Sequence, residues 1–269
     1  MRRKWAALLL CLIMAFPAAG WTEEDFSVEE IVENVLLDEE GEEIREEPAP
    51  EPAAEKGNAA REDLINRIVA LGKKLYEDAG GKRKRAHYAS DIYVCKNFTV
   101  YLFRQNRDDF RMAAYPETEL VIPNNLPAKQ CRPYAYGFLW EDVSAEKGNP
   151  FEVAAQFIYN PDLTREENMA LAMDFMRQAQ RGDYFQMSAN YEYGVGAHSA
   201  IMLGYDPETD EIHWMDSNMR GGKNKDGIRY GLVQFDAVKS VEWWASAFCH
   251  KKRGATLYRL RDDIIYTGE

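Results

Sequence analysis

The chain has 269 residues, of which 46% are hydrophobic, and its formal net charge at pH 7 is −12. This length is sufficient for one large or two small domains, and the apolar content is sufficient for a hydrophobic core. The acidic balance does not favour binding to nucleic acid, so we expect no nucleic-acid partner.

Residues 1–20 have the pattern of a secretory signal peptide. The sequence is "MRRKWAALLLCLIMAFPAAG", with a basic start, an apolar run and a small-residue end. The apolar run is short for a membrane span. A lipid on Cys11 is disfavoured because Leu10 stands where a small residue is expected. We therefore predict a secreted protein, extracellular or associated with the cell wall, with no stable membrane anchor after signal removal.

The negative charge is concentrated in residues 21–60, which contain 15 acidic and 2 basic side chains. Residues 61–269 have a net charge of only −2. The first segment is rich in Glu, Pro and Ala, so we predict an acidic disordered linker or tail. A short helix within it, over "FSVEEIVENVLL", remains open, and so does a role as a propeptide.

Residues 61–269 have the apolar periodicity of a folded domain. Apolar residues recur at helical spacing from Leu64 to Leu75, which predicts a helix that ends at "GGKRKR". The basic run Lys82 to Arg85 is interpreted as a solvated loop. The next helix is predicted over "SDIYVCKNFTVYLF", with Cys95 in its opening turns and a cap at Ser90 or Asp91.

The second half of the domain changes from helices to strands. Residues 115–161 are predicted to be irregular. A helix follows, with Thr164 and Glu167 at the spacing of a capping box and an end at Gly182. Strands are then predicted over "DYFQMSA", "HSAIMLGYD", "EIHWMDSN", "YGLVQFDAV" and "GATLYRLR", and "VEWWASAF" is interpreted as an aromatic strand. "YDPETDE" predicts a hairpin turn. The fold class predicted from this order is α+β with an antiparallel sheet.

Cys95 is the first candidate for a catalytic group. Three cysteines remain after signal removal, Cys95, Cys131 and Cys249, and an odd number leaves at least one free thiol. No Cys or His pair has the spacing of metal ligands, so we predict neither a metal nor another cofactor. A thiol near a helix N-terminus is favoured in its thiolate form, which is the nucleophile. A buried structural cysteine is the alternative.

His198 is the candidate base. It opens a predicted strand behind the glycine-rich turn "YGVGA". Asp216 and Asn218 on the next strand share one face, because residues two apart in a strand do so. Either could orient the imidazole and complete a set of nucleophile, base and orienting group. His213 lies on the opposite face and is interpreted as structural.

These residues resemble the papain-like fold in its bacterial CHAP and NlpC-type forms. The resemblance rests on a Cys at a helix start followed by "RGDYFQM", "GAHSAIMLGYD" and "IHWMDSN", covers residues 85–220, and assigns 61–269 to one such domain. It implies that Cys95 is the nucleophile, His198 the base and Asp216 the orienting residue, with Asn218 in support. The implied substrates are amide bonds of cell-wall peptides, cleaved by an amidase or endopeptidase.

The sequence departs from this family in two places. No Gln shortly precedes the Cys to help form the oxyanion hole, so Tyr93 and Asn97 are the candidates for that donor. Residues 115–161 are also longer than a minimal domain of this family needs, which suggests a lid or substrate wall.

Two other functions remain open at this point. One is a cysteine peptidase acting on peptides outside the cell wall. The other is a non-catalytic binding module of the same fold, in which the aromatic residues Tyr184, Phe185, Tyr191 and Tyr193 pack or line a cleft. The oligomeric state is also open. Cys131 and Cys249 either form a disulfide or are two separate buried thiols.

Overall fold

The computed structural model describes residues 59–81, 85–87, 90–121, 148–219 and 230–268. The predicted signal peptide, the acidic tail and Cys131 lie outside these residues. Within them the fold is α+β, as the sequence predicts. No helix in the described ranges is long and apolar enough to cross a membrane.

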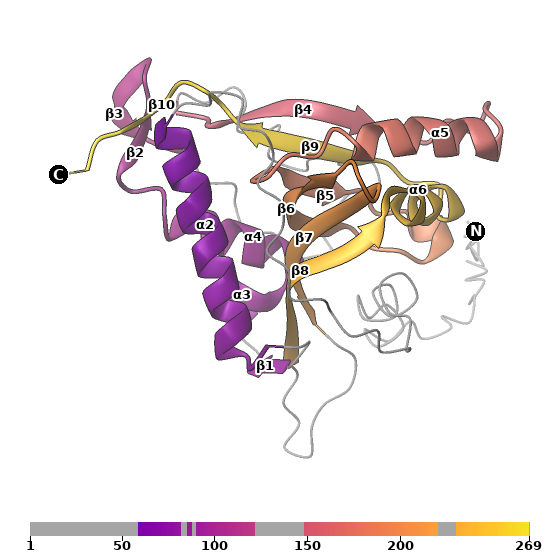
Figure 1. Ribbon diagram of the computed structural model, residues 1–269, viewed down its shortest axis with the longest axis horizontal. Helices are drawn as coiled ribbons and strands as arrows, with labels where there is room; N and C mark the ends of the chain where they lie inside the picture. Colours follow the sequence, from indigo (N-terminus) through magenta and orange to yellow (C-terminus); the bar gives the residue numbers. More distant parts are fainter. Residues whose placement is uncertain (1–58, 82–84, 88–89, 122–147, 220–229, 269) are drawn as a thin grey trace, which may run out of the picture.

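The described residues form helices in two groups and strands in two sheets (Figure 1). The helices are α2 (Ala59–Asp78), α3 (Ser90–Tyr93), α4 (Cys95–Arg104), α5 (Arg165–Met176) and α6 (Val241–His250), with a short 3-10 helix, η2, at Tyr191–Tyr193. The strands are β1 (Arg85–His87), β2 (Phe110–Met112), β3 (Tyr115–Glu119), β4 (Phe151–Phe157), β5 (Tyr184–Met187), β6 (His198–Asp206), β7 (Glu211–Met219), β8 (Tyr230–Ser240), β9 (Ala255–Leu260) and β10 (Ile264–Tyr266).

The large sheet has the strand order β1-β8-β7-β6-β5-β9-β4, and the small sheet has the order β10-β2-β3. Their strand pairings are antiparallel. In Figure 1, α2, α3 and α4 stand to the left of the large sheet, whereas α5 and α6 stand to its right. The large sheet is therefore covered by helices on both sides.

Alternating side chains of the large sheet divide the core into two clusters. Phe185, Met202 and Trp214 pack with α5 and α6 in one cluster. Tyr184 and Ile201, their chain neighbours, belong to the other cluster, which includes α2 and α4. Successive side chains of a strand point to opposite faces, so one sheet supplies both cores.

The segment around Cys95 differs from the continuous helix that the sequence predicts. Val94 has extended backbone angles, φ −77° and ψ 139°, and separates α3 from α4. Val94 is the N-cap of α4 and makes no side-chain cap, so the predicted caps at Ser90 and Asp91 are wrong for this helix. The break makes Cys95 the first residue of α4 rather than a residue inside an opening turn.

The segment "VEWWASAF" is helix α6 and not the predicted strand. Its buried residues Val241, Trp244, Ala245, Phe248 and Cys249 recur at the helical period. The side chain of Ser240 accepts a hydrogen bond from Trp243 N–H and caps the helix. The period and the cap outweigh the strand preference of Val and Trp.

Three element boundaries also differ from the prediction. Residues 115–161 are not irregular throughout, since β3 and β4 lie within them. Arg85 belongs to β1 instead of a loop. Helix α5 ends at Met176, before Gly182. The capping box of Thr164 and Glu167 is confirmed. The antiparallel β6–β7 hairpin is also confirmed.

Candidate active site

The candidate site lies where β6 and β7 separate. Their register runs from the Asp206–Glu211 pair at the hairpin turn to the Ile201–Met215 pair. Both strands continue beyond that last pair, β6 to His198 and β7 to Met219. The start of α4 meets the sheet there: Ser217 Oγ–H donates to the Tyr93 carbonyl oxygen at 3.0 Å. This contact fixes the end of α3 against β7 two residues before Cys95.

Cys95 lies at the N-terminus of α4 with its side chain turned toward β6. Its Sγ is 3.9 Å from the carbonyl oxygen of Ala197, the residue before His198. The side chain is buried, at 6% exposure. The Phe98 N–H donates to the Val94 carbonyl oxygen, which starts the helical hydrogen bonds and leaves the Cys95 N–H without an acceptor inside the helix.

His198 and Asp216 form a buried pair across the open ends of β6 and β7. The distance from His198 Nε2 to Asp216 Oδ2 is 2.7 Å. A carboxylate can only accept, so Nε2 carries the proton in this bond. Nδ1 is therefore the ring nitrogen left to exchange a proton with the Cys95 thiol.

Gln234 completes the surroundings of the Asp216 carboxylate. It pairs with Asp216 in the register of β7 and β8. Its Nε2–H donates to Asp216 Oδ1 at 3.2 Å, while Oδ2 is used by His198. Both carboxylate oxygens are thus held, which fixes the plane of the acid and through it the imidazole.

The thiol and the imidazole shift each other's protonation. Burial favours the neutral thiol, but the interaction with His198 and the N–H groups of Ser199 and Lys96 outweigh it and lower the pKa of Cys95. Burial also disfavours the charged imidazole, yet Asp216 and Cys95 raise the pKa of His198 to about 10. The two directions together favour a thiolate beside an imidazolium.

The chemical interpretation of the site rests on the positions of Cys95, His198 and Asp216. Comparison with protein-family models, curated proteins and solved structures gives no match. A thiolate at a helix N-terminus, a proton on the adjacent imidazole and a carboxylate behind it are the groups that nucleophilic catalysis on a carbonyl carbon requires. The described residues contain no group of three or more His, Cys, Asp or Glu side chains that could hold a metal ion.

The other predicted site residues, Asn218, Tyr93 and Asn97, lie on the elements that carry this set or, for Tyr93, on the helix directly before one of them. Asn218 is buried on β7, two residues after Asp216. The phenol of Tyr93 is close enough to Tyr101 and Asp78 for both to raise its pKa, although burial raises it most. Asn97 follows Cys95 by two residues, about 200° around the helix. The roles of Tyr93 and Asn97 as oxyanion donors and of Asn218 in support remain predictions.

His213 belongs to a second pair away from Cys95. Its Nδ1 is 2.6 Å from Asp236 Oδ1, and this bond raises its pKa. Tyr184 and Phe185, from the aromatic group, are core residues on opposite faces of the sheet. Tyr193 lies in η2, where Lys252 Nζ is 5.5 Å from its ring centroid.

Two residues of the site region were not singled out from the sequence, Gln234 and Arg253. Gln234 is the polar residue in the apolar strand "GLVQF", and a polar residue inside a buried strand indicates a hydrogen-bonded partner. Arg253 follows α6 in "HKKRGA", where a basic run is typical of a solvated turn. The sequence carries no signal that Arg253 is buried.

Proposed function

We propose that this protein is a cysteine hydrolase that cleaves amide bonds, with Cys95 as nucleophile, His198 as acid and base, and Asp216 as orienting residue. The main support for this proposal is the buried His198–Asp216 pair beside the thiol of Cys95 at the first position of α4. The order of Cys, His and Asp along the chain supports a papain-like arrangement, as do a helix that begins at the thiol and an antiparallel sheet against it.

The reaction follows from the protonation of the pair. The Cys95 thiolate attacks the carbonyl carbon, and the Nδ1–H of the His198 imidazolium donates its proton to the leaving amine. The product is a thioester and a free amine. Neutral His198 then takes a proton from water, which attacks the thioester and releases the carboxylic acid. The thiolate and the imidazolium are restored.

The oxyanion of each tetrahedral intermediate needs donors that are already in place. The Cys95 N–H is suited to this, because no acceptor inside α4 uses it and it lies next to the reacting sulfur. The positive end of the helix dipole also favours negative charge at this position. Asp216 keeps the proton on Nε2 and stabilises the imidazolium while the thiolate is present.

The proposed substrates are peptides of the bacterial cell wall, cleaved by amidase or endopeptidase activity outside the cell. The substrate class rests on the resemblance of the residues around Cys95, His198 and Asp216 to the CHAP and NlpC-type hydrolases. Export rests on residues 1–20. A peptidase acting on other peptides is the second candidate, and a digest of purified wall material beside casein separates the two.

Reaction with iodoacetamide tests the nucleophile independently of substrate. At pH 7 we expect Cys95 to react fast and His198→Ala to slow it about 30-fold, because an ordinary thiol is only a few per cent thiolate at that pH. Cys249 is an internal control, since burial raises its pKa. Equal rates at Cys95 in both proteins would contradict the proposal and favour a binding module.

A further inference from the structure

Arg253 is a buried arginine in the turn between α6 and β9. It is 2% exposed. Its Nη1–H donates to the carbonyl oxygen of Gly196 at 3.3 Å. Its Nε and Nη2 are shielded from solvent and have no hydrogen-bond partner among the described residues. These two atoms form one edge of the guanidinium, with parallel N–H groups that match the two oxygens of a carboxylate.

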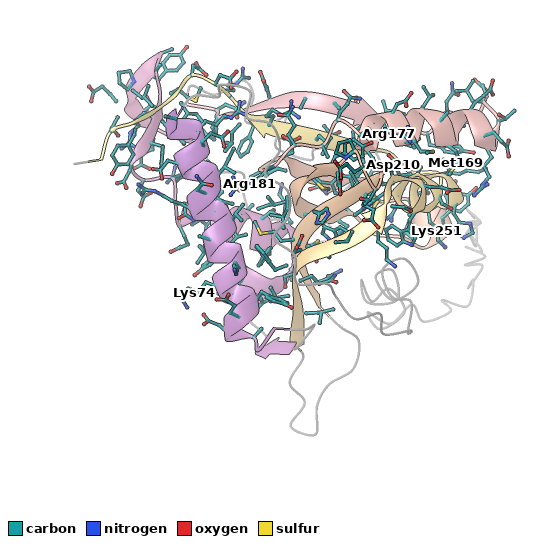
Figure 2. All side chains as sticks on the ribbon, in the orientation of Figure 1. Lys74, Met169, Arg177, Arg181, Asp210 and Lys251 are labelled. Atoms are coloured by element: carbon teal, nitrogen blue, oxygen red, sulfur yellow. The ribbon has the colours of Figure 1, made fainter. Side chains whose placement is uncertain are left out.

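In two other arginines of the chain, the same edge of the guanidinium binds a carboxylate. Arg177 donates from Nε and Nη2 to the two oxygens of Asp210, at 2.9 and 2.8 Å. Figure 2 shows these two side chains together. Arg259 does the same with Asp183, at 2.8 Å for both bonds. Arg253 presents the same edge with no carboxylate of the described chain opposite it.

The turn that carries Arg253 is held rigidly. The Arg253 N–H donates to the Phe248 carbonyl oxygen at 3.1 Å. Asn190 Nδ2–H donates to the carbonyl oxygens of Lys251 and Lys252, at 3.1 and 3.0 Å. After the arginine, the N–H of Gly254 donates to Ser188 Oγ at 3.0 Å. The backbone that carries the side chain is thus fixed on both sides of Arg253, which reduces the cost of ordering it on binding.

Arg253 lies at the same end of the sheet as the candidate active site. Met187 at the end of β5 pairs with His198 on one side and with Ala255 on the other. The carbonyl group of Gly196, which Arg253 contacts, is one residue before that of Ala197, which lies 3.9 Å from Cys95 Sγ. The two contacts and the step between neighbouring carbonyl groups, whose Cα atoms are about 3.8 Å apart, put the guanidinium within roughly 11–13 Å of the sulfur, the span of about three or four extended residues.

The electrostatics of Arg253 differ from those of the paired arginines. Asp210 raises the pKa of Arg177. Burial without a facing carboxylate lowers the pKa of Arg253 to about 9. A buried guanidinium with at least three of its five N–H donors unused is unfavourable in the free protein. A carboxylate that binds at the open edge therefore gains more free energy than one that binds a solvated arginine.

We propose that the Nε and Nη2 edge of Arg253 binds a carboxylate of the substrate, within about four residues of the amide bond that Cys95 attacks. The proposal rests on the amide hydrolysis proposed above and adds that the substrate is anionic. The edge is shielded in the free protein, so binding displaces neighbouring chain.

The test uses one wall tetrapeptide that contains Glu, made as the free acid and as the C-terminal amide, and the same pair with Gln in place of Glu. The four peptides separate a terminal carboxylate from a side-chain carboxylate. One of the two is expected to raise kcat/KM of the full chain by roughly tenfold to hundredfold over its amide counterpart. Arg253→Met should reduce that ratio to near one. Arg253→Lys, a point charge without the fork, should keep a part of it.

Arg177→Met is the matched control, because it removes a guanidinium whose fork is filled, and it should leave the ratio unchanged. The thermal midpoint of Arg253→Met should not fall below that of the unaltered chain, because the variant removes an uncompensated buried charge. An unchanged ratio in Arg253→Met, with or without a lower midpoint, would mean a structural arginine and overturn the proposal.

Calorimetry with the Cys95→Ala chain keeps this proposal separate from the proposed function. The free-acid peptide should bind this inactive variant more tightly than the amide, and the difference should vanish in the Cys95→Ala, Arg253→Met double variant. Carboxylate-dependent binding with no hydrolysis of any peptide would reject the proposed function and keep the Arg253 site. Hydrolysis without a carboxylate preference would reject the Arg253 site and keep the function.

Discussion

The proton shared by Cys95 and His198 decides the pH range in which the site can act. Hydrolysis needs the thiolate and the imidazolium together. The pKa of Cys95 is lowered, so the thiolate is lost only when the pH falls below the ordinary thiol range. The pKa of His198 is raised to about 10, so the imidazolium is lost only when the pH rises through that value. We expect a bell-shaped kcat/KM profile whose alkaline limb lies near pH 10.

Replacing the orienting carboxylate should move that alkaline limb. Asp216→Asn removes the main group that raises the pKa of His198, so the limb should shift toward the ordinary imidazole value of about 6.5. We also expect kcat/KM at pH 7 to fall by about a hundredfold or more, because the amide neither stabilises the imidazolium nor fixes the tautomer. Asn218→Ala is the comparison and should have a smaller effect. A larger effect of Asn218→Ala would make Asn218 the orienting residue.

At the scale of elements, the position of Cys95 depends on how α3 rests on the sheet. A Cβ on Gly231 of β8 would overlap the Cβ of Tyr93, at the end of α3. Gly231→Ala should therefore push α3 away and move Cys95, at a cost of about 1–3 kcal/mol from overpacking. We expect slower alkylation of Cys95 at pH 7 together with a lower thermal midpoint.

Thr164→Ala is a control for that loss of stability. Thr164 caps α5 through Glu167, and its removal should cost about 1 kcal/mol. Helix α5 packs on the face of the sheet opposite α4, so the alkylation rate of Cys95 should not change. If both variants slow the alkylation, reduced stability rather than the position of α3 controls the reactivity of Cys95.

The elements that the sequence predicts well are those whose signals are local. The β6–β7 hairpin follows from its turn residues, and the capping box of α5 from Thr164 and Glu167. The residues of α6 favour a strand because Val and Trp have high strand preference, although the spacing of the apolar residues is helical. The break at Val94 between α3 and α4 was not predicted, and the close approach of Tyr93 to Gly231 of β8 beside it is a long-range contact that no local pattern indicates.

The same distinction applies to the site. The pairing of His198 with Asp216 could be proposed because neighbouring strands of a hairpin bring it about, and the structure places the two side chains in contact. Gln234 and Arg253 could not be placed from the sequence. The register that sets Gln234 opposite Asp216 shifts between Trp214 and Asp216, and Arg253 contacts Gly196, which is 57 residues away.

At the scale of the whole molecule, the two cores share one sheet and should unfold together. Cys249 is a free thiol in the cluster with α5 and α6. Cys95 begins α4, whose residues Phe98 and Leu102 belong to the cluster on the other face. A residue such as Phe185 in one cluster has its chain neighbour Tyr184 in the other, so the loss of either core disturbs the other.

Alkylation of these two cysteines in urea tests this coupling. At pH 6.5 the reaction of Cys95 should slow on unfolding, because its pKa returns to the ordinary thiol value, whereas the buried Cys249 should become reactive. We expect two signals of opposite direction with one urea midpoint, read at each cysteine by mass spectrometry. Reaction of Cys249 without a reductant would also exclude a disulfide to Cys131.

Phe248→Ala shows whether the coupling extends across the sheet. The variant removes a buried ring that stacks on Phe157 and Phe185 in the cluster with α5 and α6. A loss of about 3–5 kcal/mol is expected from the cavity. Because both faces belong to one cooperative unit, the transition at Cys95 should move by as much as the one at Cys249. A change of the urea midpoint at Cys249 alone would mean that the α5–α6 face unfolds separately. The candidate site would then depend for its stability only on the α2–α4 side of the sheet.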